Sequence, residues 1–294
     1  MVILVTGASG MLGTDLCEAA RQHGLDVHGT DIRDREHPVD ITNARQVAGL
    51  MQALRPDVVI HCAAYTDVEG AEGRPMDAYR TNALGSWVLA SQADRIGAAL
   101  CYISTDFVFD GTKAAPYHEF DPPAPINVYG ASKLAGEKAV ARHCRRHWIA
   151  RTAWLYGRNG RSFVRTIVEK ASANQPLKVV ANQIGSPTCT RDLAQAILRL
   201  IAGAPYGTYH TVNQGHASWY ELACAAIGLA GYDSGCVHPV SASEWPSVVR
   251  RPAYSVLETL TGPAADLPPM RPWQDALRDF LTQLKADATG APCP

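Results

Sequence analysis

The chain has 294 residues and a nearly balanced charge, with 27 Lys and Arg against 28 Asp and Glu and a formal net charge of -1. This length suits one large α/β unit that carries a smaller lobe. No long run of one charge sign is present, which argues against nucleic acid or an anionic membrane as a partner, so we expect a small-molecule ligand.

Eight Cys and ten His are scattered without a Cys-x-x-Cys pair or any metal-ligand spacing, which predicts reduced thiols and no metal. Strand-like residues begin at Val2, and no apolar run has the length of a membrane span. We therefore expect a cytoplasmic protein without a signal peptide. We expect it to be a monomer or a homodimer.

A glycine-rich turn follows the first predicted strand, Val2–Val5, and precedes a helix that runs to about His23. Gly7, Gly10 and Gly13 give the spacing G-x-x-G-x-x-G, slightly different from the G-x-G-x-x-G of many dinucleotide sites. Glycines in such a turn let backbone amides approach a pyrophosphate at the helix N-terminus. Because a strand precedes the turn and a helix follows it, the pattern favours a dinucleotide site over an ordinary connection.

The second predicted strand, residues 26–30, ends at Asp31. A carboxylate at this place accepts hydrogen bonds from the adenine ribose hydroxyls, which favours NAD. Arg33 and Arg35 follow at once, and either guanidinium could meet the 2′-phosphate of NADP. The sequence therefore predicts NADPH or NADH as cofactor without deciding between them.

A short third strand is predicted at Val39–Ile41, with Asp40 beside the adenine amino group. An equally good interpretation places Asp40 next to Asn43, the N-cap of a helix predicted at residues 44–54. The sequence does not decide between these two interpretations.

Small residues follow the next buried strand, residues 58–62, and let the chain pass under a flat cofactor. The acidic, glycine-containing segment 67–74 predicts a loop. A long helix at about 76–97 leads to a further strand, 100–103, after which Thr105 stands.

Strands alternate with helices throughout the first hundred residues, which is typical of a doubly wound parallel sheet. Such sheets bind ligands beyond the carboxyl ends of their strands. Gly7, Asp31, Ala64 and Thr105 all follow predicted strands, so we expect ligand and chemistry at that edge. The predicted fold is α/β and Rossmann-type, with a smaller C-terminal α/β lobe.

Tyr129 and Lys133 stand four residues apart at the start of a predicted helix. Three prolines between 122 and 125 exclude a helix before them, whereas 131–145 is rich in helix formers, so the two side chains share one face. An ammonium beside a phenol lowers the phenol pKa, which suits the tyrosine for acid or base catalysis. Such pairs also arise by chance, but here a glycine turn and Thr105 at a strand end accompany the pair.

Residues 1–133 resemble the extended short-chain dehydrogenases/reductases, because the glycine turn, a Ser/Thr at a strand end and Tyr-x-x-x-Lys occur in that order. Longer motifs across most of the chain resemble the dTDP-4-dehydrorhamnose reductase family. They are Gly-Ala-Ser-Gly-Met-Leu-Gly at 7–13, Cys-Ala-Ala-Tyr-Thr at 62–66, Ser-Thr-Asp-Phe-Val-Phe-Asp-Gly at 104–111, Asn-Val-Tyr-Gly-Ala-Ser-Lys-Leu-Ala-Gly-Glu at 127–137, Arg-Thr-Ala-Trp-Leu-Tyr at 151–156, Gly-Ser-Pro-Thr at 185–188 and Arg-Pro-Ala-Tyr-Ser at 251–255.

This resemblance implies hydride transfer from NADPH or NADH to C4 of a dTDP-6-deoxy-4-keto-hexose, the last step to dTDP-rhamnose. It implies that Tyr129 donates a proton to the carbonyl oxygen, that Thr105 polarises this carbonyl, and that Lys133 lowers the Tyr129 pKa and holds the nicotinamide ribose. The implied substrate contacts are Thr105, Asp106, Tyr129 and Trp154. The implied cofactor contacts, which include the glycine turn, are Gly7, Gly10, Met11, Leu12, Gly13, Asp31, Asp40, Ile41, Ala63, Ala64, Tyr65, Thr66, Tyr129 and Lys133.

Two positions depart from the family pattern. Phe107 stands where a Tyr is common, which removes a hydroxyl near the substrate loop. Arg191 stands where some relatives carry an acidic residue associated with a metal at a subunit contact, and we therefore predict no metal. Burial alone favours Trp154 as a core aromatic, whereas the family match favours its contact with substrate.

Residues 1–156 are predicted to form the dinucleotide-binding domain, and residues 157–294 mainly a smaller substrate lobe with some segments returning to the main sheet. Arg250 and Arg251 could meet the substrate diphosphate, although a solvated basic pair explains them equally well. The tail from residue 287 is expected to fray. The predicted elements of this half are helices 162–174, 192–201, 219–229 and 273–285 and strands 177–180 and 207–210.

Two other functions would use the same features. A sugar-nucleotide dehydratase or epimerase shares the fold and the Tyr/Lys pair, but dehydratases carry Asp-Glu after the Thr, and Phe107 cannot transfer a proton. A 4-epimerase that needs only Tyr129 stays open. A non-catalytic NADP-binding regulatory subunit, like the β subunit of methionine adenosyltransferase, also resembles this family, but the intact Thr105, Tyr129 and Lys133 favour catalysis.

Overall fold

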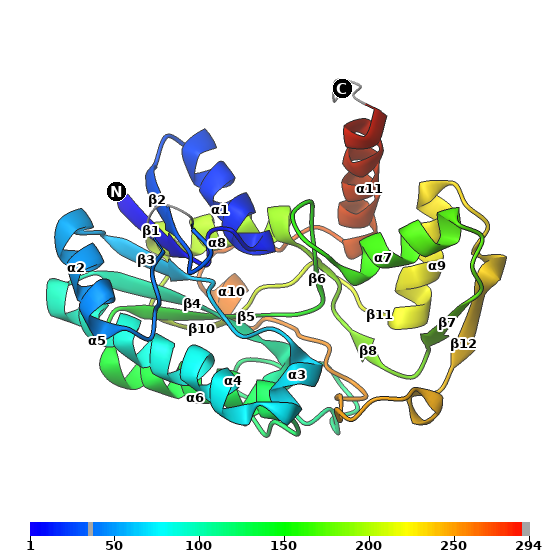
Figure 1. The fold of residues 1–294 in the computed structure, drawn as a ribbon, viewed down its shortest axis with the longest axis horizontal. Coiled ribbons are helices and arrows are strands. Elements are labelled where there is room, and N and C mark those ends of the chain that lie inside the picture. Colours follow the sequence, from blue (N-terminus) through cyan, green and yellow to red (C-terminus); the bar gives the residue numbers. More distant parts are fainter. Residues whose placement is uncertain (35–37, 290–294) are drawn as a thin grey trace.

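The computed structural model describes residues 1–34 and 38–289, and a six-stranded parallel sheet forms its centre (Figure 1). The strand order is β10-β5-β4-β3-β1-β2, which confirms the predicted doubly wound fold. All seven residues of β4 are buried, as expected for a parallel strand covered on both faces. The strands are β1 (Val2–Thr6), β2 (Asp26–Thr30), β3 (Val58–His61), β4 (Ala99–Thr105), β5 (His147–Thr152) and β10 (Gly207–His210).

Helices cover both faces of this sheet with apolar side chains. On one face, α1 (Met11–Gln22) and α8 (Thr190–Gly203) bury Leu16 and Ile197 completely. On the other face, α2 (Ala44–Leu54), α5 (Gly85–Ile96) and α6 (Val128–His143) bury residues such as Met51 and Leu89. Burial of each such side chain contributes roughly 1.5–3 kcal/mol, so the two layers hold the strand ends in fixed relative positions.

The predicted strand at Val39–Ile41 does not form. Asp40 Oδ1 accepts hydrogen bonds from the backbone N–H and the hydroxyl of Thr42, both at 2.8 Å, and the chain turns here. Asn43 then caps α2 by accepting from the N–H groups of its first turn. The alternative interpretation of Asp40, as a neighbour of the N-cap, is therefore confirmed.

The predicted loop at 67–74 contains a short helix, α3 (Val68–Gly73), because Asp67 caps it through the Gly70 N–H at 2.9 Å. The predicted long helix is divided into α4 (Pro75–Tyr79), a π-helical turn η1 (Arg80–Leu84) and α5. Two Asn82 contacts fall in this π turn: its Oδ1 accepts from Tyr65 N–H at 2.8 Å, and its Nδ2 donates to Ser132 Oγ at 2.9 Å. The turn therefore joins the loop after β3, which contains Tyr65, to α6.

The predicted helices and strands of the second half are confirmed. The elements there are β6 (Leu155–Tyr156), α7 (Phe163–Ser172), β7 (Leu177–Val180), β8 (Ile184–Gly185), β9 (Thr188–Cys189), β11 (Ala217–Ser218), α9 (Trp219–Ala230), β12 (Val237–Val240), α10 (Thr261–Ala264) and α11 (Trp273–Thr289), with 3-10 turns η2 (Asp106–Val108), η3 (Ser234–Cys236) and η4 (Ala242–Glu244). In Figure 1, α7, α9, β7 and β12 lie together beside the main sheet, whereas α8 and β10 belong to the body around that sheet. Within the described ranges, no helix is both long and apolar enough to cross a bilayer.

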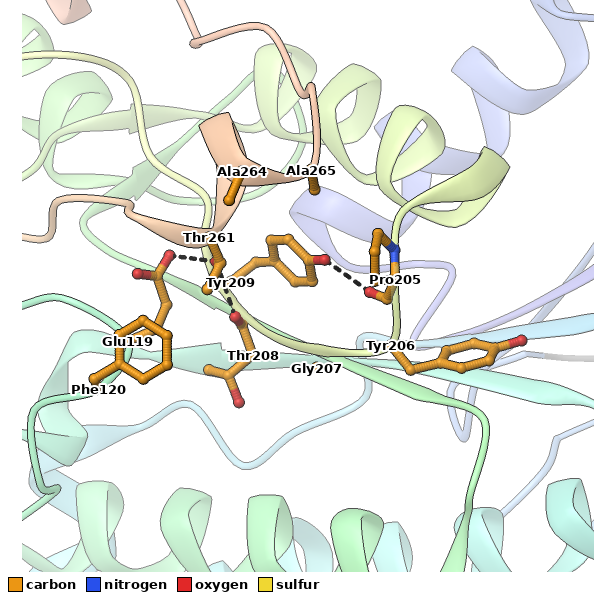
Figure 2. A pocket seen from close by; sticks show the side chains of 10 residues that line it. All are labelled: Glu119, Phe120, Pro205, Tyr206, Gly207, Thr208, Tyr209, Thr261, Ala264 and Ala265. Atoms are coloured by element: carbon orange, nitrogen blue, oxygen red, sulfur yellow. Dashed lines mark hydrogen bonds between the residues drawn. The ribbon is translucent and has the colours of Figure 1, made fainter.

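A cavity of about 450 Å³ lies beside the free edge of β10 (Figure 2). Glu119 covers this edge: its Oε1 accepts from the His210 N–H at 3.0 Å and from the hydroxyls of Thr259 and Thr261 at 2.6 and 2.8 Å. Its Oε2 accepts from the Leu260 N–H at 2.9 Å. One carboxylate therefore blocks an edge where a foreign strand could otherwise pair.

Glu119 should stabilise the fold in a pH-dependent way. Burial alone would raise its pKa, but hydrogen bonds from Thr259, Leu260 and His210 lower the pKa to about 2. Because the folded pKa lies below the unfolded one, this stabilisation is complete above about pH 4.5 and is lost as the pH falls toward 2. We expect Glu119→Gln to lower the free energy of unfolding by about 1–3 kcal/mol at neutral pH and by about half as much or less near pH 3.

Urea unfolding of the wild type and Glu119→Gln at both pH values measures this difference. Glu169→Gln is the control, because Glu169 is exposed and its ion pair with Arg165 spans 3.8 Å. An equal loss of stability at both pH values would contradict the assigned role of the Glu119 charge.

Candidate active site

A cavity of about 840 Å³ lies along the carboxyl edge of the main sheet. Its wall includes every residue to which the family resemblance assigns a cofactor or substrate contact. They are Gly7, Gly10, Met11, Leu12, Gly13, Asp31, Asp40, Ile41, Ala63, Ala64, Tyr65, Thr66, Thr105, Asp106, Tyr129, Lys133 and Trp154. Residues of α7 and α9, including Phe163 and Trp219, also line it.

The glycine turn is packed so closely that side chains are excluded. Gly7 has a φ of +70°, and a Cβ there would lie 2.6 Å from the Ala63 backbone nitrogen. A Cβ on Gly13 would lie 2.2 Å from the Gly7 carbonyl oxygen. Gly10 is the N-cap of α1 and offers no side chain to the amides of the first turn. The turn thus presents backbone N–H groups to the cavity, which suits a pyrophosphate.

Asp31 is buried at the end of β2 and accepts hydrogen bonds from the Ser9 N–H at 3.2 Å and from the Arg33 N–H and Nε at 2.9 and 3.3 Å. Burial alone would raise the pKa of Asp31, but these hydrogen bonds and the Arg33 charge lower it below its usual value. The carboxylate is therefore ionised and suited to ribose hydroxyls. Arg33 also lines the cavity, whereas Arg35 lies outside the described residues.

Three buried hydroxyls of residues on the cavity wall have no hydrogen-bond partner within the described part of the chain. They belong to Thr30, at the end of β2, to Tyr65, after β3, and to Thr152, at the end of β5. A buried hydroxyl without a partner is costly, so a polar ligand that reaches both ends of the cavity would relieve this cost. Together with the glycine turn and Asp31, these hydroxyls fit an extended dinucleotide.

Tyr129 and Lys133 lie in the first turns of α6, as predicted. Asn127 caps this helix by accepting from the Gly130 N–H at 2.8 Å. Lys133 is buried, and its Nζ donates to the Ile103 carbonyl at 2.6 Å and stands 4.1 Å from the centre of the Tyr102 ring. Burial lowers the pKa of the Lys133 ammonium to about 7, although Glu137 acts in the opposite direction.

The sequence predicts that Lys133 lowers the pKa of Tyr129, and the structure shows the opposite direction. Burial raises the pKa of Tyr129 to about 12, and the hydrogen bond with Thr105 lowers it by less. The ammonium donates to Ile103 instead, so burial dominates the phenol. Tyr129 therefore carries its proton at neutral pH, which is the form that a proton donor needs.

Thr105 is held at the end of β4 by its neighbours. Its hydroxyl donates to Asp106 Oδ1 at 3.0 Å and accepts from the Phe107 N–H at 3.2 Å. Asp106 Oδ2 accepts from the Ser255 hydroxyl at 2.6 Å, and burial raises the pKa of Asp106 to about 6. The Phe107 ring packs edge-on against Tyr129, with ring centres 5.8 Å apart, so this departure from the family pattern places an apolar wall beside the proton donor.

Trp154 stacks on Trp219, with ring centres 3.5 Å apart and an angle of 4° between the planes. Its φ of +48° is unusual for a bulky residue, and the stacking partner from α9 compensates for this strain. A Cβ on Gly185 would lie 2.3 Å from the Trp154 ring, so Gly185 leaves the space that this ring fills. Both indoles line the cavity.

Residues 1–286 match the family model described as RmlD substrate binding domain. The chain is 37% identical to dTDP-4-dehydrorhamnose reductase of Mycolicibacterium smegmatis, over 99% of this chain and 88% of that protein. The chain belongs to the dTDP-4-dehydrorhamnose reductase family. It is also 39% identical to spore coat polysaccharide biosynthesis protein SpsK of Bacillus subtilis, over 96% of this chain and 97% of that protein. The crystal structure of dTDP-4-dehydrorhamnose reductase from Bacillus anthracis in complex with NADP superposes with a TM-score of 0.92 at 40% identity, over 96% of this chain and 99% of that one.

In this family member, two contacts of the site are not predicted by the sequence. Trp219 is predicted only as the start of a helix, because its partner Trp154 is far away in the chain. Ser255 lies within a family motif without an assigned role. Arg251, which the sequence offers as a partner of the substrate diphosphate, lines the cavity and pairs with Glu69 at 2.7 Å.

Of Arg250 and Arg251, Arg251 thus lines the cavity, whereas Arg250 is exposed and is not on the cavity wall.

The seven cysteines that the structure describes are free, four of them buried, while Cys293 lies outside the described residues. Across residues 1–34 and 38–289, no group of three or more His, Cys, Asp or Glu is placed to hold a metal ion.

Proposed function

We propose that this chain reduces the C4 ketone of dTDP-4-dehydro-6-deoxy-L-mannose to dTDP-L-rhamnose with NADPH or NADH. It is an oxidoreductase of the dTDP-4-dehydrorhamnose reductase family. The observation that supports this activity most directly is that Thr105, Tyr129 and Lys133 line the same cavity as the glycine turn. A proton donor and a dinucleotide site in one cavity are the two requirements of a carbonyl reductase.

The chemistry of these residues follows from their protonation and burial. When bound, the nicotinamide cofactor supplies the hydride for C4. Tyr129 is protonated at neutral pH and gives its proton to the developing C4 alkoxide. When the substrate binds, the Thr105 hydroxyl turns from Asp106 Oδ1 to donate its hydrogen bond to the same oxygen. Lys133, buried four residues beyond Tyr129 on the same helix face, holds the ribose hydroxyls.

The second half of the chain contributes the residues that are proposed to bind the substrate. We propose that residues 1–156 mainly bind the cofactor and that residues 157–294 mainly form the substrate lobe. Phe163, Trp219 and Arg251 line the cavity from this second half and suit an apolar base, a sugar ring and a phosphate, respectively. The monomeric or homodimeric state stays a prediction.

The test is loss of reduced-nicotinamide absorbance from NADPH, and separately from NADH, on addition of the 4-keto sugar nucleotide. We expect rapid oxidation of at least one cofactor and none with dTDP-glucose, which has no ketone. Tight NADPH binding without oxidation by any 4-keto sugar nucleotide would overturn the proposal in favour of a regulatory subunit.

We expect Trp154 to contact the bound sugar nucleotide and not the cofactor. In Gly185→Ala the new methyl group would overlap the Trp154 ring and displace it from Trp219. We expect the KM for the sugar nucleotide to rise about tenfold, which corresponds to about 1.4 kcal/mol, while the Kd of NADPH stays unchanged. Steady-state kinetics and fluorescence titration measure the two quantities.

Gly203→Ala is the matched control, because Gly203 ends α8 with open space around it. An unchanged KM in Gly185→Ala would contradict the role of Trp154. An equal rise in the NADPH Kd would assign Trp154 to the cofactor.

A further inference from the structure

Glu137 lies on α6 one turn beyond Lys133 and does not reach the cavity wall. Tyr129, Lys133 and Glu137 follow one another at intervals of four residues, so they share one face of the helix. Glu137 is 4% exposed, which is rare for a glutamate without close partners. The proposed reaction gives this carboxylate no role, since it cannot touch either ligand.

Three hydrogen bonds hold the Glu137 carboxylate. The Ser104 hydroxyl donates to Oε1 at 2.5 Å. Arg151 donates through Nε to Oε1 at 2.9 Å and through Nη2 to Oε2 at 2.8 Å, and both side chains of this ion pair are 5% exposed. A bidentate pair of this kind fixes orientation as well as distance.

The partners of Glu137 lie at the ends of two neighbouring strands. Ser104 and Arg151 are paired in the register of β4 and β5. Ser104 immediately precedes Thr105, and Arg151 is three residues before Trp154. The Glu137 carboxylate on α6 is therefore bound to the end of β4, which carries Thr105, and to the end of β5, after which Trp154 follows.

We propose that Glu137 is a positioning residue, which locks α6 against the ends of β4 and β5 and so places Tyr129 and Lys133 against Thr105 and Trp154. This role rests on the proposed reduction. Displacement of reacting groups by about 1 Å can lower a rate about 100-fold, so a helix anchor at this point controls kcat.

The charge of Glu137 also acts on Lys133. Burial lowers the Lys133 pKa, and Glu137 and then Cys62 raise it. The other groups that face Lys133 are the Tyr102 ring and His61, whose pKa is lowered to about 3 by burial, so His61 is neutral. The Cys62 thiol is also neutral at pH 7 because burial raises its pKa well above its usual value. Among the groups around Lys133, Glu137 therefore contributes most in favour of the ammonium.

A buried ion pair can also serve folding alone, and removal of one partner leaves the other charge unpaired. Two variants separate these roles. Glu137→Gln removes the charge but keeps the shape. Glu137→Met with Arg151→Met replaces both charges by apolar groups of similar volume, which restores folding but not the anchor. Glu169→Gln, an exposed glutamate paired with Arg165, is the control.

We expect both Glu137 variants to lower kcat about 100-fold, with the KM for the sugar nucleotide and the NADPH Kd within about threefold of wild type. In Glu137→Gln the basic limb of the pH profile should also move to lower pH, because the Lys133 ammonium loses a favourable charge. Wild-type kcat in the folded double variant would overturn the proposal.

A measurement without substrate keeps this test independent of the proposed activity. NMR of protein labelled with carbon-13 and nitrogen-15 in its lysines, assigned with Lys133→Met, follows the Lys133 titration in wild type and Glu137→Gln. We expect the pKa in the variant to be lower by about one unit. An inactive wild type would overturn the proposed function only, whereas an unchanged Lys133 pKa would overturn the influence of Glu137.

Discussion

Tyr129→Phe should lower kcat for reduction of the 4-keto sugar nucleotide by about 10³-fold, the usual contribution of a positioned proton donor. The phenol holds its proton at neutral pH because burial raises its pKa to about 12, and Phe keeps the ring but has no proton to give. The KM and the NADPH Kd should change little, since the ring contact with Phe107 is retained. Single-turnover oxidation of NADPH measures the effect.

Tyr232→Phe is the matched control, because Tyr232 is 43% exposed and is absent from the cavity wall. We expect its kcat to equal that of wild type. A Tyr129→Phe enzyme with kcat within about threefold of wild type would assign the proton donation to another group.

Gly13→Ala should raise the NADPH Kd at least 100-fold. The added Cβ would lie 2.2 Å from the Gly7 carbonyl oxygen, so α1 must move away from the turn. This movement displaces the N–H groups that face the pyrophosphate, and loss of two such hydrogen bonds to a charged group costs about 3 kcal/mol. Fluorescence titration with NADPH measures the Kd, and circular dichroism confirms that the variant is folded.

Gly49→Ala provides the comparison for this variant. Gly49 lies within α2, has open space around it and should accept a methyl group with a gain in stability of about 0.5–1 kcal/mol. We expect its NADPH Kd to be unchanged. Wild-type affinity in folded Gly13→Ala would contradict the assignment of the glycine turn to the cofactor.

The sequence predicted those parts of the site that depend on local signals. The glycine spacing after β1 and the prolines before Asn127 act within a few residues, so both the phosphate turn and the start of α6 could be placed. The predicted strand at 39–41 was wrong, because β-branched residues favour a strand there whereas the hydrogen bond between Asp40 and Thr42 makes the chain turn. Asp67 was likewise overlooked as the cap of α3.

Contacts between distant segments could not be predicted in this way. Spacing places Lys133 on the Tyr129 face, but the Ile103 carbonyl that holds its ammonium belongs to another strand. The direction of the Tyr129 pKa was wrong for the same reason, since burial depends on the whole fold. The stacking of Trp154 on Trp219 joins segments that have no common local signal.

The central claim is that this cavity transfers a hydride to C4 of a dTDP-4-keto sugar. The most direct measurement uses NADPH carrying deuterium at the transferable position of the nicotinamide, followed by NMR of the sugar nucleotide. We predict deuterium at C4 of dTDP-L-rhamnose in the wild type and none in Tyr129→Phe over the same time. A wild-type enzyme that binds NADPH and the sugar nucleotide but leaves C4 without deuterium would contradict the claim.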